Sequence, residues 1–544
     1  MTTNPINRYN TIHMKIKQFL MLVLLIAGSA FSLAAQDASF YKKYAEKGDK
    51  EAMYNLAECY LNGSGGVTED MNQVTFWLTK AAKKNYAPAQ VKLAYCYLFG
   101  TGVLKDYKQA WELVQKAVKQ DNADALYLTA SMYKDGLYVN QDWNKWRQFI
   151  DRAAKLGSSD AQYVLGHAYL YGLSEANIAQ NPDFAVSWLR KAADRGDSDA
   201  SYDLGVCYEL GIGVPQDEST AIGYYYTAAN AGNSAAQCEV AKAYILGRYG
   251  LDINYSEGYK YVNAAIAQED PVAYSLMGDI YYFGAGTEVN YEKAAEWYKK
   301  ASDANNAWGA AKLAELYRMG LGVTKDENKA FLLYRKAVDT DADDMTGLAG
   351  LGICYEKGCG VSKNILTAIL YYKKAADKGN NYATMRLYRL YREGEGVSKD
   401  TNQAIQYLRQ AADNGSNDAI YNLGKEYWIG EILHEDDAAA IKYMTQAADN
   451  GMDFAAGVLG TIYYSGIGTV TKNYNLAYKY LSQAVRSPEE FGNALLSEVY
   501  RDLAACYRFG RGTEVDHGLA SYYTELAAKY GDEGSVIAVK ELMR

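Results

Sequence analysis

Residues 383–412 read ATMRLYRLYREGEGVSKDTNQAIQYLRQAA and contain the pattern that decides the fold. Ala383, Leu387 and Tyr391 follow one another at intervals of four residues, which places them on one face of a helix. Gly394 then ends this helix, because glycine tolerates the positive φ found just past a helix terminus. The aspartate at the end of the loop can cap the helix that follows, whose paired alanines allow close packing. The stretch therefore predicts a helical hairpin made of a helix A and a helix B.

The same pattern, Ala-x-x-x-Leu-x-x-x-Tyr-x-x-Gly, recurs along the chain thirteen times. Seven of the twelve intervals between starts are 36 residues, and every start is followed by Tyr eight positions later and by Gly eleven positions later. Such regularity indicates an array of structural repeats. The starts are Ala52, Ala89, Ala125, Ala161, Ala200, Ala236, Ala273, Gly309, Gly347, Ala383, Ala419, Ala455 and Val499.

Stacking of the hairpins follows from the apolar face of each one. A single hairpin cannot bury that face, so neighbouring hairpins must cover one another. We therefore predict an all-α fold in which residues 52–534 form an array of thirteen repeats. Residues 36–51 are expected to cap the N-terminal end with an unpaired helix B, and residues 535–544 to cap the other end with a last helix.

The N-terminal residues 1–35 have the order of a signal peptide. Two lysines precede an apolar run at 19–27, and small residues follow it. The run is shorter than the roughly 20 apolar residues of a membrane span, so cleavage is favoured over an uncleaved anchor and no stable span would remain. Met14 offers an alternative start. The mature chain is predicted to be exported to the periplasm, the cell envelope or the medium.

The repeat, with its Gly-x-Gly-Val-x-x-Asp loop at 394–400, resembles that of the Sel1-like family, relatives of the tetratricopeptide repeat with a slightly longer unit. The resemblance covers about residues 38–544, and the chain is identified as an exported bacterial member. It implies a right-handed superhelical α-solenoid of about 13 helix-turn-helix repeats. It also implies a scaffold for protein complexes, often at a membrane or in a bacterial envelope.

Composition and residue placement argue against several classes of function. The net charge of −9 gives no reason to expect nucleic acid as a partner, because phosphate binding needs a concentrated basic face. The Gly-x-Gly loops follow helices rather than strands, which argues against nucleotide binding. The four histidines lie too far apart for a metal site or a network of bases, and no nucleophile stands beside a base. We predict a non-enzymatic protein without cofactor or metal.

Seven cysteines raise the question of disulfides in an exported chain. Equivalent positions of adjacent repeats should lie about 8–10 Å apart, too far for a disulfide, which needs Cα atoms within about 7 Å. The states of Cys238 and Cys359 stay open. The other five precede the recurring tyrosine, where the remaining repeats have apolar residues and only Glu426 is polar, and they are expected to be small core residues. These five are Cys59, Cys96, Cys207, Cys354 and Cys506.

A row of tyrosines on the A helices is the first candidate binding surface. Helix A usually lines the concave surface of such solenoids, where aromatic rows can anchor a bound chain or stack on sugar rings. Packing between helices is the alternative and favoured interpretation. The row consists of Tyr54, Tyr127, Tyr163, Tyr202 and Tyr421, two residues after the starts of their repeats.

A basic stripe is the second candidate surface. It could receive an acidic peptide or a carboxylate-bearing polymer through bidentate arginine contacts. Neutralisation by the nearby Glu393 and Glu395 is an alternative of equal weight. The stripe consists of Arg386, Arg389 and Arg392 on one helix A, Lys425 in the next repeat, and Lys312 and Arg318 two repeats before.

The sequence thus predicts a protein-protein interaction scaffold or adaptor of the bacterial periplasm or cell envelope. Its partners would be proteins or peptides bound along the concave face. The alternative is carbohydrate or peptidoglycan binding, with cell-wall polymer held by the tyrosine row and by tryptophans such as Trp77, Trp188 and Trp428. Binding to purified cell-wall material in the absence of protein would distinguish the two.

Overall fold

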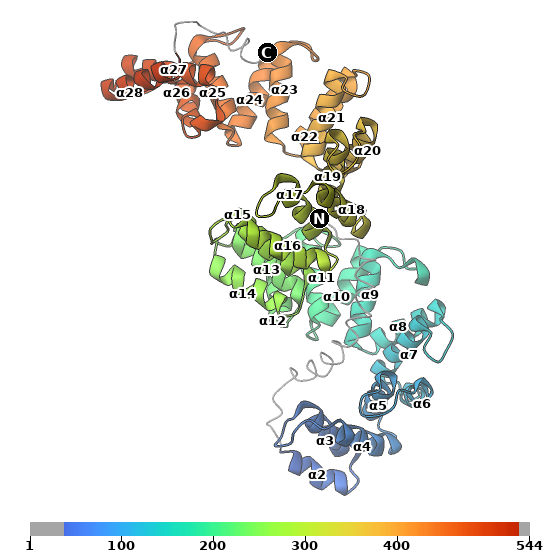
Figure 1. Cartoon of the computed structure of the whole chain (residues 1–544). Coiled ribbons are helices and arrows are strands. Elements are labelled where there is room, and N and C mark those ends of the chain that lie inside the picture. Colours follow the sequence, from blue (N-terminus) through green and yellow to red (C-terminus); the bar gives the residue numbers. More distant parts are fainter. Residues whose placement is uncertain (1–36, 532–544) are drawn as a thin grey trace. The chain divides into compact units, whose positions relative to one another are not determined.

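A computed structural model describes residues 37–531 of the chain. In this range the regular secondary structure consists of the helices α2 to α28 and two one-turn 3₁₀ helices, with no β-strand (Figure 1). An isolated bridge between Leu173 and Ile178 is the one β-type contact among the described residues. The prediction of an all-α fold is confirmed.

The A helices of the thirteen repeats carry odd numbers. They are α3 (Lys50–Asn62), α5 (Ala87–Phe99), α7 (Ala123–Asp135), α9 (Ser159–Tyr171), α11 (Ser198–Leu210), α13 (Ser234–Leu246), α15 (Pro271–Phe283), α17 (Ala307–Met319), α19 (Met345–Lys357), α21 (Asn381–Glu393), α23 (Asn417–Ile429), α25 (Asp453–Ser465) and α27 (Asn493–Phe509).

The B helices carry even numbers and alternate with the A helices along the chain. They are α2 (Ala38–Glu46), α4 (Met71–Lys83), α6 (Tyr107–Val118), α8 (Trp143–Lys155), α10 (Pro182–Ala193), α12 (Glu218–Asn230), α14 (Tyr255–Ile266), α16 (Tyr291–Asp303), α18 (Glu327–Thr340), α20 (Ile365–Asp377), α22 (Thr401–Asp413), α24 (Asp437–Asp449), α26 (Tyr474–Ala484) and α28 (His517–Lys529).

The hairpin of α21 and α22 shows how the local sequence sets the ends of the helices. Gly394 adopts a φ of 77° just past α21, and its N–H donates to the carbonyl of Leu390. Gly396 also has a positive φ, and a Cβ there would come within 2.2 Å of Ile365. The side chain of Asp400 accepts a hydrogen bond from the backbone N–H of Gln403 at 3.0 Å and so caps α22. Both glycines of the loop are therefore required, one by its conformation and the other by a close approach as well.

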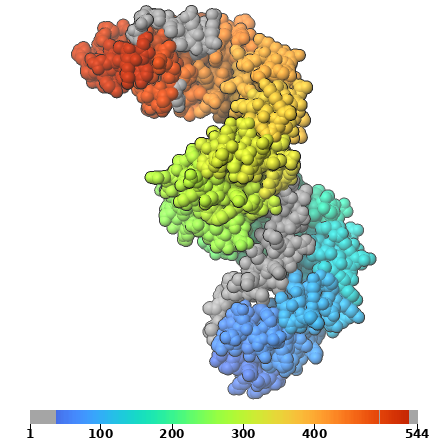
Figure 2. Space-filling model, in the orientation of Figure 1, coloured from blue at the N-terminus to red at the C-terminus, as the bar shows by residue number. Residues whose placement is uncertain are grey.

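Two compact units make up the chain, Met1–Val289 and Asn290–Arg544, and each is an array of hairpins in its described part. Within a unit, each A helix packs against the B helices before and after it. Neighbouring A helices also pack together, as α9 with α11 in the first unit and α17 with α19 in the second, and no two successive B helices within 37–531 do so to a similar extent. The A helices therefore line the inner, concave side of each array. Figure 2 shows the packed atoms of the chain, coloured by residue number.

The core is built from the recurring small and aliphatic positions. Ala383 and Leu387 of α21 are fully buried, as are Ala404 and Leu408 of the partner helix α22. These side chains belong to one hydrophobic cluster that also contains residues of the neighbouring hairpins, such as Leu348 and Leu423. The prediction of an α-solenoid is confirmed for the array of repeats.

At the N-terminal end of the described range, helix α2 lies within the predicted capping segment 36–51 and ends at Glu46. Helix α3 already begins at Lys50, inside that segment. The predicted signal peptide at 1–35 and the predicted C-terminal cap at 535–544 lie outside the described residues. None of the helices between residues 37 and 531 has the length and apolar character needed to cross a membrane.

All seven cysteines lie in the described range, and each is buried as a thiol. The five that precede the recurring tyrosine belong to the hydrophobic core, as expected. Cys238 and Cys359, which the sequence left open, are buried thiols as well. Burial raises the pKa of Cys207 and of Cys506 to about 12, so both thiols are protonated at neutral pH.

We therefore expect the folded chain to resist thiol reagents. Ellman's reagent should react with none of the seven thiols at neutral pH in the native protein, because a buried, protonated thiol is a poor nucleophile. All seven should react once guanidinium has unfolded the chain without a reductant. Fast reaction in the native state, or a shortfall of thiols after unfolding, would contradict this assignment.

Candidate interaction surface

The inner side of the second unit carries the predicted basic stripe. Arg386, Arg389 and Arg392 follow one another at intervals of three residues on α21, so they lie near one face of that helix. Lys425 lies on α23 in the next repeat, 36 residues after Arg389 and at the equivalent position. The structure gives these four cations different surroundings.

Glu356 on α19 is the first of two buried carboxylates beside the stripe, and its side chain is 9% exposed. Its Oε2 accepts a hydrogen bond from the Tyr372 hydroxyl at 2.5 Å and another from Nε of Arg386 at 3.3 Å. Nη2 of Arg386 also contacts the other oxygen of the same carboxylate. A buried carboxylate needs such partners, because ionising it without them costs several kcal/mol. Arg386 is therefore committed to Glu356.

Glu426 on α23 is the second buried carboxylate, and its side chain is 1% exposed. Its Oε1 accepts hydrogen bonds from the Tyr388 hydroxyl at 2.6 Å and from Nε of Arg392 at 3.0 Å. Nη2 of Arg392 pairs in addition with the carboxylate of Glu431, which is nearly half exposed. Burial and the hydrogen bond to Glu426 hold the pKa of Tyr388 well above its usual value. Arg392 and Tyr388 are therefore both tied to one buried oxygen.

Arg389 and Lys425 have no such partners. Arg389 is exposed and Lys425 half-buried, and neither forms an ion pair with any residue that the structure describes. Burial and the neighbouring charge of Arg392 lower the pKa of Lys425, as expected beside positive charge that is not fully neutralised. Two of these four cations, Arg386 and Arg392, are therefore held in ion pairs within the fold, and the other two are not.

The carboxylates that neutralise the stripe differ from those named from the sequence. In the described part of the chain the pairing partners are Glu356, Glu426 and Glu431 rather than Glu393 and Glu395. Two repeats earlier, on α17, one of the two cations named from the sequence is paired within the helix, and the other, Arg318, interacts with Tyr334. There Lys312 pairs with Glu315 at 2.8 Å.

One of these partners had a visible signal in the sequence and the other did not. Glu426 is the single polar residue at the position that precedes the recurring tyrosine, which marks it as a buried charge in need of a partner. Glu356 stands two positions further along its repeat, where nothing in the sequence suggests burial. Its hydroxyl partner Tyr372 comes from a B helix, so only the folded structure brings the two together.

The tyrosine row is packed between helices. Tyr421 is buried against Phe454, with ring centroids 5.5 Å apart, and Tyr54 is half-buried against Tyr86 at 5.7 Å. This geometry favours the packing interpretation over an open aromatic binding surface. The other three members, Tyr127, Tyr163 and Tyr202, are half-buried as well.

Two of the three tryptophans named for sugar stacking are in the core. Trp77 is 5% exposed and Trp428 1% exposed, so neither offers an open indole face. Their assignment to a carbohydrate surface was wrong, because both lie within hydrophobic clusters. Trp188 is half-buried, and the ammonium of Lys191 lies 4.1 Å from its ring centroid.

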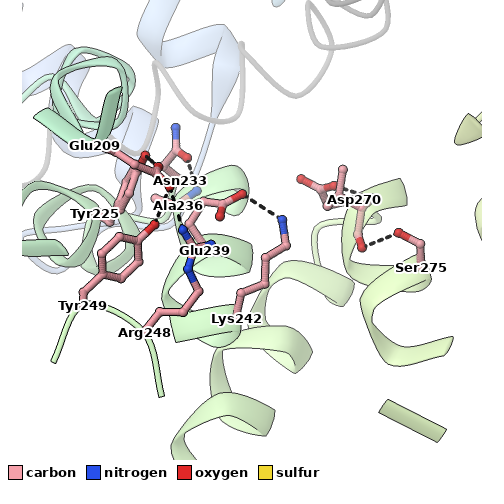
Figure 3. Close-up of polar contacts among 11 residues, drawn as sticks. Glu209, Tyr225, Asn233, Ala236, Glu239, Lys242, Arg248, Tyr249, Asp270 and Ser275 are labelled. Carbon is pink, nitrogen blue, oxygen red and sulfur yellow. Dashed lines mark hydrogen bonds and ion pairs between the residues drawn. The ribbon is translucent and has the colours of Figure 1, made fainter. Parts of the chain in front are cut away.

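In a polar cluster of the first unit, three side chains donate hydrogen bonds to one carboxylate (Figure 3). Glu209 of α11 accepts hydrogen bonds from the hydroxyls of Tyr225 and Tyr249, at 2.6 and 2.7 Å, and from Nη2 of Arg248 at 2.9 Å. Burial acts to raise the pKa of Glu209, but these hydrogen bonds outweigh it and lower the pKa. Arg248 and Tyr249 belong to the loop after α13, so the cluster fastens this loop to α11.

Histidine and acidic side chains form no metal-type cluster in the described range. No group of three or more His, Cys, Asp or Glu side chains between residues 37 and 531 is placed to hold a metal ion. His167 contacts Asp203 through Nδ1 at 2.8 Å, which joins α9 to α11.

Comparison with protein families matches the chain to the Sel1 repeat thirteen times, and the matches coincide with the hairpins of one A and one B helix. They span residues 50–86, 87–122, 123–158, 159–197, 198–233, 234–270, 271–306, 309–339, 346–380, 381–416, 417–452, 455–487 and 497–532.

The solved structures that are similar to the chain include two bacterial proteins. One is c5321, a protective antigen present in uropathogenic Escherichia coli strains that displays an SLR fold. It is 25% identical, with a TM-score of 0.51, over 92% of this chain and 99% of its own. A Sel1 repeat protein from Oxalobacter formigenes is also 25% identical, over 60% of this chain and 91% of its own, with a TM-score of only 0.38. Comparison with curated proteins gave no match.

The buried pair of Glu426 and Arg392 predicts a specific loss of stability. Glu426→Leu introduces the residue found at this position in the preceding repeat, Leu390. It should lower the free energy of unfolding by about 3 kcal/mol, because Tyr388 and Arg392 lose their buried acceptor. Guanidinium denaturation followed by circular dichroism measures the change.

Glu431→Gln is the matched control for this substitution. It removes the exposed partner of Arg392 and should cost at most about 1 kcal/mol. Adding Tyr388→Phe and Arg392→Met to Glu426→Leu should recover part of the loss. Equal effects of Glu426→Leu and Glu431→Gln would show that the buried pair contributes nothing special.

Proposed function

The chain belongs to the Sel1 repeat family, and from this membership we propose that it is a non-enzymatic protein-protein interaction scaffold of the bacterial periplasm or cell envelope. Sel1 repeat proteins generally mediate protein-protein interaction, and the family is generally non-catalytic. The proposal adds to this the place of binding, namely the concave face formed by the A helices.

One observation carries the proposal, the preformed order of the inner surface of the second unit. The buried carboxylates of Glu356 and Glu426 hold Arg386 and Arg392 in fixed positions before any partner arrives. A surface whose long side chains are already ordered loses less conformational entropy on binding. Repeated shallow contacts on such a surface suit an extended protein segment better than they suit a small substrate, which needs an enclosed pocket.

Export is supported by the N-terminal pattern of residues 1–35 and by one relative. The similar protein c5321 is a protective antigen of uropathogenic Escherichia coli, and the likeness extends over almost its whole length. Cell-wall polymer is the weaker alternative partner, since Trp77 and Trp428 are buried and the tyrosine row is packed between helices. Binding of the chain to purified sacculi would favour that alternative.

Photocrosslinking in living cells tests the scaffold and its face together. A photoreactive phenylalanine replaces Tyr382, which is 49% exposed on helix A α21, or Leu370, which is 54% exposed on helix B α20. The first variant should give discrete protein adducts in the envelope or periplasmic fraction, and the second should give few. Similar adducts from both positions would contradict binding on the concave face, and adducts from neither would contradict the scaffold.

A further inference from the structure

The basic stripe of the second unit contains a pair of cations that the fold leaves available. Arg386 forms an ion pair with Glu356. Arg392 forms ion pairs with Glu426 and Glu431. Arg389, between them on the same helix, has no ion-pair partner among residues 37–531. The fold therefore holds Arg386 and Arg392 in ion pairs and leaves the guanidinium of Arg389 available to bind a partner.

Lys425 extends this pair into the next repeat. It occupies the position on α23 that Arg389 occupies on α21, so the two cations lie at the same height on neighbouring A helices. The two helices are joined through side chains, since Tyr388 and Arg392 of α21 donate hydrogen bonds to Glu426 of α23. Burial is the main cause that lowers the pKa of Lys425, and the positive charge of Arg392 is the second. A carboxylate bound beside Lys425 would relieve this repulsion.

An exposed tyrosine shares the helix face of Arg389. Tyr382 lies four residues before Arg386 and seven before Arg389 on α21, which places the three on one helical face. Tyr382 is 49% exposed, and its ring stands edge-on to that of Tyr372, 6.5 Å away between centroids. Tyr382 thus offers an apolar contact on the same face of α21 as Arg389.

We propose that Arg389 and Lys425 bind two carboxylates of an extended, acidic segment of a partner protein, a proposal that rests on the scaffold function above. Side chains at alternate positions of an extended chain point the same way and lie about 7 Å apart, since the rise is about 3.3 Å per residue. This spacing suits two cations on adjacent A helices that both have long, flexible side chains. The segment recognised is therefore one with Asp or Glu at alternate positions, crossing from α21 to α23.

The excess of positive charge supports an acidic partner over a neutral one. Arg389 and Lys425 are cations, and the carboxylates next to them on Glu356 and Glu426 are already occupied by other donors. A basic partner would be repelled there, while an acidic one would find two cations that need not be released from existing pairs.

Fluorescence anisotropy with a synthetic peptide tests this assignment on the full mature chain. The probe is a labelled decapeptide with Glu at alternate positions, and its control has Gln in their place. The chain should bind the Glu peptide and not the Gln peptide. The double variant Arg389→Gln with Lys425→Gln should weaken binding by about tenfold or more.

Two cations on the B helices of the same repeats provide the matched control. Arg409 on α22 and Lys442 on α24 are both exposed, and the double variant Arg409→Gln with Lys442→Gln changes the net charge by the same amount. It should leave the affinity within about twofold, because these two cations lie outside the proposed site. A general electrostatic effect would instead weaken binding equally in both double variants. Circular dichroism should show equal helicity for the two double variants.

Several results would overturn the proposal. They are equal affinity for the Glu and Gln peptides, equal losses from the two double variants, or binding of a soluble polyuronate in preference to the peptide. None of these results would contradict the proposed scaffold function. If photocrosslinks at position 382 persist in the Arg389→Gln, Lys425→Gln background, the concave face still binds partners and only the acidic segment is refuted.

Discussion

The structure depends on the inability of one hairpin to bury its own apolar face. The alanine and leucine positions of an A helix, such as Ala383 and Leu387, become solvent-inaccessible only when the neighbouring hairpins pack against them. Each repeat therefore stabilises the next, and the A helices approach one another more closely than the B helices do. The concave face and everything arranged on it are consequences of this stacking.

Stacking also explains why charge can be buried on the inner face. A carboxylate on one A helix is covered by a neighbouring repeat, which then supplies donors to it. Glu356 receives Arg386 from the following A helix, and Glu426 receives Arg392 from the preceding one. These contacts join three successive repeats through α21 and order its arginines. The inner surface of the second unit is thus a stabilising element, and the binding surface that we propose there uses different residues.

The sequence predicts the repeats and the basic stripe, but it does not predict which side chains pair across repeats. The thirteen repeats, the glycine that ends each helix A and the buried cysteines follow from a period that repeats throughout the chain. The stripe of Arg386, Arg389 and Arg392 was also visible as a spacing. The division of the stripe into paired and unpaired arginines was not visible, because the carboxylate partners lie on other repeats and approach only when the helices pack. The tryptophans show the same limit, since Trp428 is as plausible on a surface as in a core until its neighbours are placed.

Selective modification of arginine tests the central claim most directly. Phenylglyoxal reacts with accessible guanidinium groups, and mass spectrometry of the folded mature chain can follow Arg386, Arg389 and Arg392 separately after digestion. The account predicts fast modification of Arg389 and protection of the other two, which are held against buried carboxylates. The protection of Arg392 should disappear in the Glu426→Leu variant. Equal rates at all three arginines in the native chain would contradict the division of the stripe on which the proposed binding surface is built.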